Sequence, residues 1–165
     1  MRGWRFATLI VPAVTAAISI SGPLRAQSAD SIAVLAVIDH LFTAMAQRDT
    51  AAARALLAPR SQIVAVRGDT AAAPRVQSDT AFIRALGSGR GQLHERIWSP
   101  TVQIHGPLAM VWAPYDFHLD GQRTHCGVDA FTLVRADSLW RVVEIAYTIE
   151  RRDCAPSPLG PLRQR

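Results

Sequence analysis

The spacing of hydrophobic positions changes once along the chain, near residue 90, from a helical period to strand alternation. Before that point, apolar side chains first recur three or four residues apart at Ile32, Leu35, Ile38, Phe42 and Met45. This spacing predicts an amphipathic helix that begins at Asp30 or Ser31, either of which is a good N-cap. A polar stripe that contains His40 runs along the same segment and is expected to face solvent.

Two shorter helices are predicted next. Asp49 or Thr50 can cap an alanine-rich helix that ends before Pro59, because a proline disfavours helical backbone in the residue before it. Ser78 can cap a third helix that ends at Gly87. Between them, residues 62–67 form a short β-rich run, and residues 70–74 are small enough to be a loop.

From Leu93 onward the pattern predicts an antiparallel meander. Its strands are expected at residues 93–98, 101–105, 108–119, 123–135 and 139–150. The Asp120-Gly121 pair between two alternating runs is the strongest hairpin signal. Helices followed by such strands predict an α+β fold, in which three N-terminal helices pack on a strongly curved antiparallel sheet. A sheet that curls round helices forms a cone, and its hollow suits a small molecule.

The N-terminus has the order of a secretory signal peptide. Arg2 and Arg5 precede an apolar run from Phe6 to Ile20, and the small residue Ala26 stands at a plausible cleavage site. The run is shorter than the roughly 20 residues that span a bilayer, although an uncleaved anchor remains the alternative. We therefore predict a signal peptide at 1–26, a folded domain at 27–154, a disordered tail at 155–165, and a periplasmic or secreted product with no membrane contact after cleavage.

Charge and short motifs exclude several classes of function. The net charge of +5 falls to +2 without the arginines of the predicted signal, and no basic cluster with interleaved aromatics suggests nucleic acid. His94, His105 and His118 lack the spacing of metal ligands. No phosphate-binding loop or nucleophile turn is found, so the sequence predicts neither a metal nor a cofactor.

The two cysteines, Cys126 and Cys154, would share an oxidising compartment after export. A disulfide between them would attach the C-terminal tail to the sheet. Their spacing does not establish the Cα approach that a disulfide requires, so both the bridged and the free state stay open.

Strand alternation sorts the side chains of the meander onto two faces. With a two-residue turn at Asp120-Gly121, Asp116 faces His125 and Trp112 faces Asp129. One face then carries Arg96, Trp98, Gln103, Met110, Trp112, Asp116, His125, Asp129 and Phe131. The more apolar face, expected to lie against the helices, carries Glu95, Ile97, Val102, Ile104, Val111, Tyr115, Phe117, Cys126, Val128 and Ala130. A β-bulge would exchange the faces beyond it.

Four residues are candidates for acid–base chemistry. Glu95 and Tyr115 would place a carboxylate and a phenol in an apolar cavity, where they could move a proton and hold an oxyanion. Asp116 could orient His125 as a general base. Both pairs also have a structural interpretation, as a core tyrosine with an arginine-paired glutamate and as a cross-strand pair. The candidate ligand-binding residues are Glu95, Trp98, Trp112, Tyr115, Phe117, His125 and Asp129.

The strand motifs resemble one known group of proteins. They are the runs Glu95–Trp98, Gly106–Phe117, His125–Phe131 and Trp140–Thr148. In element order and in these runs, the chain resembles the nuclear transport factor 2-like superfamily, and more narrowly its small exported bacterial members described as SnoaL-like or putative lumazine-binding. The resemblance implies a cone-shaped, cystatin-like roll that is commonly dimeric.

The resemblance implies less about function, because the superfamily contains isomerases, dehydratases, epoxide hydrolases and cyclases beside non-catalytic binding proteins. No residue-by-residue match to one of their catalytic sets is found. We therefore expect an exported homodimer, paired through the sheet, that binds a small apolar or aromatic molecule. An acid–base enzyme and a pure interaction module are the alternatives.

Overall fold

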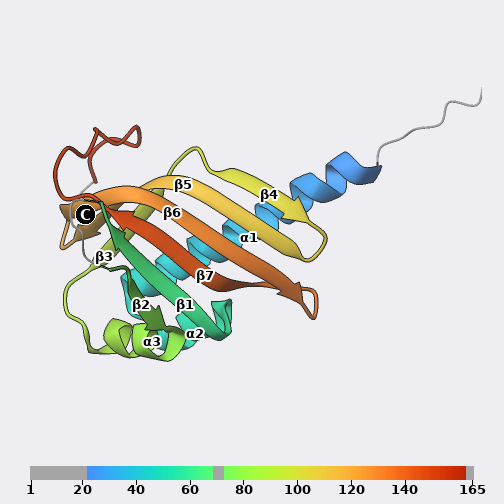
Figure 1. The fold of residues 1–165 in the computed structure, drawn as a ribbon, viewed down its shortest axis with the longest axis horizontal. Coiled ribbons are helices and arrows are strands. Elements are labelled where there is room, and N and C mark those ends of the chain that lie inside the picture. The colour runs from blue at the N-terminus through green and yellow to red at the C-terminus, as the bar shows by residue number, and fades with distance from the viewer. Residues whose placement is uncertain (1–21, 69–72, 163–165) are drawn as a thin grey trace, which may run out of the picture.

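The computed structural model describes residues 22–68 and 73–162 of the 165-residue chain. Most of the predicted signal peptide, at residues 1–21, lies outside the described residues. In the described part, three helices pack on one side of a curled seven-stranded sheet (Figure 1). The long first helix runs behind the sheet in Figure 1, and the two short helices gather at the end formed by the first two strands.

The helices are α1 (Gly22–Gln47), α2 (Thr50–Leu56) and α3 (Asp79–Ser88). Both predicted short-helix caps are confirmed. The Asp49 carboxylate accepts hydrogen bonds from the backbone N–H of Ala51 and Ala52, at 3.0 and 2.9 Å. The Ser78 hydroxyl accepts one from Ala81 N–H, at 3.2 Å. These bonds satisfy amides that the first turn of each helix would leave unpaired.

Helix α1 is the main support of the sheet. Its residues Ala29–Gln47 are apolar and long enough to pass a length-and-composition test for a membrane span. Val34, Ile38 and Leu41 are completely buried in the protein core, which is the role a core helix plays in a globular fold. Ile32 was expected on the buried stripe but is 71% exposed, so that stripe begins at Val34.

The strands are β1 (Leu57–Arg67), β2 (Arg75–Ser78), β3 (Leu93–Ile97), β4 (Thr101–His105), β5 (Leu108–Leu119), β6 (Gln122–Ala136) and β7 (Leu139–Ile149). They form the order β2-β1-β7-β6-β5-β3, and β4 also pairs with β5. The predicted meander is thereby confirmed, with strand ends that differ by a residue or less.

The prediction of a purely antiparallel sheet is wrong in one place, because β1 runs parallel to β7. No hairpin joins these two strands, so no turn geometry forces them to be antiparallel. Strand β1 follows α2 directly, and the strand that pairs with it, β7, is the last strand of the meander. Strand β1 also begins at Leu57, earlier than predicted, and Pro59 lies inside it.

Curvature arises where two short strands share one long neighbour. Strand β3 pairs with the second half of β5, and β4 pairs with its first half. Between them, Ser99 adopts a positive φ of 45°, and Trp98 N–H donates to the carbonyl of Pro114 at 3.2 Å. The interruption lets the sheet bend over α1. We call the side that faces the helices the concave face and the opposite side the convex face.

A β-bulge in the β5–β6 hairpin changes the predicted face assignment. The turn itself is the predicted two-residue type, with positive φ at Asp120 and Gly121. Beyond it, His118 pairs with Arg123 but Phe117 pairs with His125, so Thr124 has no partner in the ladder.

The extra residue exchanges the two faces of β6. His125, Asp129 and Phe131, predicted on the same face as Trp112, lie on the concave face. Cys126, Val128 and Ala130 lie on the convex face, opposite to the prediction. Asp116 consequently pairs with Cys126 instead of His125, and Trp112 pairs with Ala130 instead of Asp129.

Candidate ligand-binding site

The cone encloses a cavity of about 420 Å³ between the helices and the concave face. Helices α1 and α3 and strands β1, β2, β3, β5, β6 and β7 all contribute to its lining. The apolar part of the lining includes Leu41, Phe42, Met45, Ile63, Phe82, Leu86, Leu93, Phe117, Phe131 and Ile145. A second cavity, of about 530 Å³, lies between α1 and β3, and Glu95 and Phe42 border both cavities.

Glu95 and Asp129 are neighbouring carboxyl groups at the inner wall of the cone. Glu95 borders the cavity, and Asp129 is only 1% exposed. The two groups interact electrostatically, yet neither Asp129 oxygen has a hydrogen-bond partner in the described part of the protein. We therefore regard them as adjacent carboxyls, not as a bonded pair.

The surroundings of this pair favour protonation. Burial raises the pKa of Glu95 to about 8. Burial and the Glu95 charge also raise the pKa of Asp129 well above its usual range. Two carboxyls in a low-dielectric site titrate as a unit, so the pair holds at least one proton at neutral pH. A protonated carboxyl can donate a hydrogen bond to a ligand.

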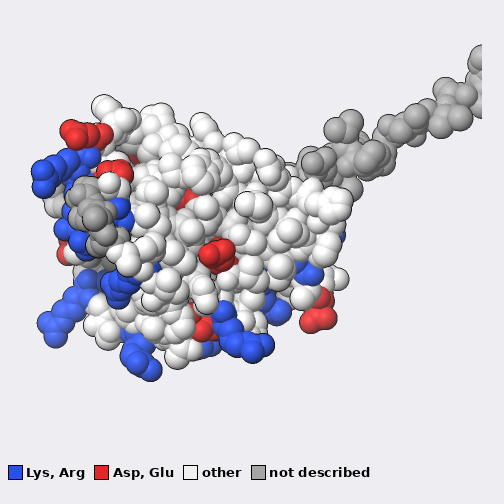
Figure 2. Space-filling view, in the orientation of Figure 1, with Lys and Arg blue, Asp and Glu red and all other residues white. Residues whose placement is uncertain are grey.

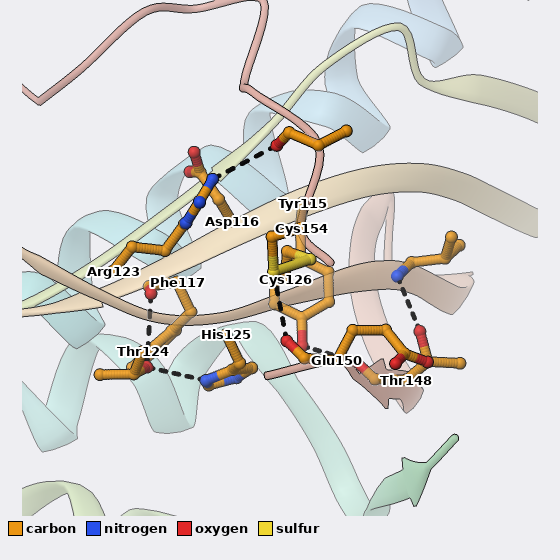
Figure 3. Close-up of a disulfide and its surroundings, with 12 residues drawn as sticks. Tyr115, Asp116, Phe117, Arg123, Thr124, His125, Cys126, Thr148, Glu150 and Cys154 are labelled. Atoms are coloured by element: carbon orange, nitrogen blue, oxygen red, sulfur yellow. Dashed lines mark hydrogen bonds between the residues drawn. A yellow bond between two sulfur atoms is a disulfide. The ribbon is translucent and has the colours of Figure 1, made fainter. Parts of the chain in front are cut away.

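His125 borders the same cavity. Its ring stacks on Phe117 with 4.9 Å between centroids and meets Tyr115 edge-on at 5.7 Å (Figure 3). Its Nδ1 lies 2.8 Å from the hydroxyl of Thr124, the bulged residue. Burial and the nearby charge of Arg151 lower the pKa of His125 to about 4. The imidazole is therefore neutral under ordinary conditions.

Tyr115 lies on the concave face with Glu95, as predicted, but does not border the cavity. Its side chain is 1% exposed, and its hydroxyl donates to the carbonyl of Thr148 at 2.7 Å (Figure 3). The phenol proton is thus used in a hydrogen bond to the backbone, so it is not available to a ligand in the cavity.

Tyr147, which the sequence analysis missed, is the tyrosine that borders the cavity. It pairs with Asp129 across the β6–β7 ladder, and its ring lies 6.3 Å from that of Tyr115. Burial and the Glu95 charge raise the pKa of its phenol. Strand alternation in β7 was the available signal, but it required the correct face of β6.

Asp116 points away from the cone. Its carboxylate accepts a hydrogen bond from Arg96 Nε at 2.8 Å, and its second oxygen pairs with the same guanidinium. His118 Nδ1 lies 3.7 Å from it. The predicted Asp116–His125 pair is not formed, because the bulge turns the two side chains to opposite faces. Asp116 belongs to a buried ion pair of the convex side.

Neither predicted tryptophan borders the cone. Trp112 is 59% exposed on the convex face, and Trp98 is half-buried beside the β3–β4 turn. Three of the seven predicted ligand-binding residues, Glu95, Phe117 and His125, border the cavity. Asp129 does not border the cavity itself, but it lies next to Glu95, which does.

Cys126 and Cys154 are joined by a disulfide with 5.9 Å between their Cα atoms (Figure 3). The bridge attaches the segment after β7 to the convex side of β6. Further hydrogen bonds hold this segment, from Arg123 to the carbonyl of Ala155 and from Arg96 to that of Gly160. Residues 155–162 form no helix or strand.

Three helices on a curled mixed sheet, with an apolar cone, define an α+β fold that is shared with a solved structure described as nuclear transport factor 2-like with a cystatin-like fold. The sequence model of the family described as putative lumazine-binding matches residues 29–148, so the chain belongs to that family. A search of curated proteins finds no match.

Solved structures support the same fold. A protein of unknown function from Mycobacterium tuberculosis superposes with a TM-score of 0.70 at 11% identity, covering 82% of this chain and 80% of that one. A nuclear transport factor 2-like protein with a cystatin-like fold from Novosphingobium aromaticivorans gives 0.65 at 15% identity, covering 83% and 94%. A putative dehydratase of the same class from Streptomyces avermitilis gives 0.61 at 13% identity, covering 75% and 98%.

Proposed function

We propose that this protein binds a small, largely apolar or aromatic molecule inside the cone. The observation that carries the proposal is the cavity itself, because about 420 Å³ of space with a mainly apolar lining matches the size and character of ordinary ligand sites. The aromatic rings of Phe42, Phe82 and Phe117 favour a flat ligand. The family description, putative lumazine-binding, is consistent with a small fused-ring compound.

Glu95 supplies the main polar contact in this proposal. Because the Glu95–Asp129 pair retains a proton at neutral pH, it can donate to a carbonyl oxygen or ring nitrogen of the ligand. A donor at the inner end of an apolar cavity helps to fix the orientation of a ligand.

The proposal includes export to the periplasm or the exterior. The disulfide supports it, since such bonds persist mainly in oxidising compartments. The predicted cleavage site lies within α1, before Asp30, which pairs with Arg135 at 2.7 Å, and before the fully buried Val34. Cleavage after Ala26 would leave these contacts intact.

The proposal also includes a homodimer formed through the convex face. Leu108, Met110 and Trp112 are 45%, 52% and 59% exposed there. Figure 2 shows that the side of the sheet turned toward the viewer is largely uncharged, with an acidic group near its middle and most charged groups at its margins. A second copy packed over these three side chains would bury an exposed apolar patch.

Native mass spectrometry of protein purified from its own host tests the binding proposal, because a retained molecule would appear as added mass. Variant A85W should reduce its retention, since Ala85 borders the cavity. Variant A52W adds the same bulk at an exposed position of α2 and should retain the molecule. If no molecule is retained and no aromatic compound raises the melting temperature, the binding proposal is wrong.

An acid–base enzyme is the second candidate, and the Glu95–Asp129 pair is the observation that favours it. A carboxyl with a pKa of about 8 is suited to exchange protons near neutral pH. The dehydratase name of the Streptomyces avermitilis structure is compatible with this candidate. If this candidate is right, E95Q should abolish any turnover found with a retained molecule. Unchanged turnover in E95Q would exclude Glu95 as an acid–base residue.

A further inference from the structure

The lining of the cone has an unequal charge balance. Arg48, Arg75 and Arg90 all border the cavity, and Glu95 is the one acidic residue among the described residues of its lining. Because the Glu95 carboxyl retains its proton near neutral pH, it offers little negative charge to balance three guanidinium groups. A site for a neutral molecule would not need this excess of positive charge.

Arg48 holds the loop that follows α3. Its guanidinium donates to the backbone carbonyls of Leu86, Arg90 and Gly91, at 2.9, 2.6 and 2.9 Å. Three bonds from one side chain keep the loop beside the cavity, and with it the side chain of Arg90. Arg48 is therefore a positioning residue for the entrance.

Arg75 and Arg90 are different, because their guanidinium groups have no ion-pair or hydrogen-bond partner within residues 22–68 and 73–162. Both residues are exposed although both border the cavity, which places them at its mouth. An unpaired guanidinium presents donors in a fork that matches a carboxylate or another oxyanion.

The sheet aligns Arg75 with the carboxyl pair at the inner wall. Arg75 pairs with Ala65, Ala65 with Tyr147, and Tyr147 with Asp129, so these four residues form one row on the concave face. Three strand spacings of about 4.8 Å separate the ends of this row, or about 14 Å along the sheet. The row therefore runs from a cation at the mouth, past a phenol, to a proton-bearing carboxyl inside.

We infer that the ligand of the cone is an anionic amphiphile, whose apolar body fills the cavity while its oxyanion group is held at the mouth by Arg75 and Arg90. This inference rests on the proposed function and adds the charge and orientation of the ligand. A cationic ligand would be repelled by the mouth. A neutral ligand would leave both guanidiniums without a role.

Two fluorescent probes with one skeleton test the inference. The first, 8-anilinonaphthalene-1-sulfonate, is anionic, and N-phenyl-1-naphthylamine is the same ring system without the sulfonate. Each is titrated into the wild type and into A85W, and only the signal that A85W reduces is assigned to the cone. We expect the anionic probe to bind about tenfold more tightly, and this preference to weaken at high salt.

The double variant R75Q/R90Q should bring the two probes to equal affinity. Variant R84Q removes an exposed arginine of α3 that does not border the cavity, so it should keep the preference. Displacement of the anionic probe by decanoate and by decyl phosphate, with decanol as neutral control, identifies which oxyanion the mouth prefers.

The outcomes separate the inference from the proposed function. Equal affinity of the two probes in the wild type, or a preference that survives in R75Q/R90Q, overturns the anionic ligand and leaves the binding site in place. If decanol displaces the anionic probe as strongly as decanoate and decyl phosphate do, the anionic ligand is likewise overturned and the binding site stays in place. If neither probe gives a signal that A85W reduces, the binding site itself is wrong, and the inference falls with it.

Discussion

Glu95 on β3 lies beside Asp129 on β6, and within the described residues neither carboxyl pairs with a basic side chain. Most buried acids in folded proteins are neutralised by a cation, as Asp116 is by Arg96 in this protein. A buried acid pair without such a partner is costly to ionise. One member of the pair, Glu95, borders the cavity, and this position makes the cone the candidate site.

The first prediction concerns the effect of pH on stability. Glu95 has a pKa of about 8 in the folded protein and about 4.5 when exposed. The folded state therefore binds more protons between these values, so the stabilisation present below pH 4.5 is lost as the pH rises through 8. The free energy of unfolding should fall by up to about 1.4 kcal/mol per pH unit across this window.

Urea denaturation of the wild type and E95Q at pH 5, 7 and 9 measures this slope. E95Q removes the ionisable group, so its slope should be smaller and its stability at pH 9 higher than that of the wild type. Variant E144Q changes an exposed glutamate and should keep the wild-type slope. An identical slope in E95Q would show that Glu95 is ionised in the folded state at neutral pH.

The second prediction separates structural acids from those of the cone. D116A should destabilise the protein by about 3 kcal/mol or more, because it leaves the Arg96 guanidinium without its buried partner. D30A breaks the more exposed pair with Arg135 and should cost less than about 1 kcal/mol. Neither variant should change probe affinity, measured by fluorescence titration at a temperature where both are folded. A large loss of affinity in D116A alone would connect the convex side to the cone.

The third prediction concerns the disulfide. Replacing both cysteines in C126A/C154A should lower the free energy of unfolding by about 3 kcal/mol, because the bridge closes a loop across a sequence separation of 28. Alkylation of the unreduced, denatured wild type should label no thiol, as read by intact mass. Labelling of both cysteines would show that the bridge is absent from the purified protein.

The fourth prediction tests the proposed dimer. M110E and W112R each place a charge on the exposed convex face, where a second copy would have to desolvate it. Either change should convert a dimer to a monomer in analytical ultracentrifugation. R54Q removes the charge of an exposed α2 side chain, away from the convex face, and should leave the association state unchanged. A monomeric wild type would rule out this interface.

Local patterns were sufficient for most of the fold. Asp49 and Ser78 cap the helices that their spacing predicted, since a side-chain cap depends only on neighbouring backbone amides. The turn at Asp120-Gly121 is equally local, because both residues tolerate the positive φ that the hairpin needs. Strand alternation also placed Glu95, Tyr115 and Phe117 on one face.

The candidate site was predictable only in part, and the reason is one residue. Thr124 has no ladder partner, so every side chain of β6 beyond it is turned to the face opposite to that predicted. His125 and Asp129 thereby enter the concave side, and the supposed Asp116–His125 pair disappears. Nothing in the alternation of Gln122 to Phe131 marks Thr124 as the bulged position.

The sequence by itself determined the two short helices, the meander, the tight hairpin and the family, because each depends on short-range spacing or on motifs within one element. It also predicted the first helix, although α1 begins at Gly22 and not at Asp30 or Ser31. Only the tertiary structure decided that β1 runs parallel to β7, that β6 faces the cone with His125 and Asp129, and that Arg75 and Arg90 meet at its mouth. These relationships join residues far apart in the chain, and a single extra residue in a strand reverses them, so local patterns carry no information about them.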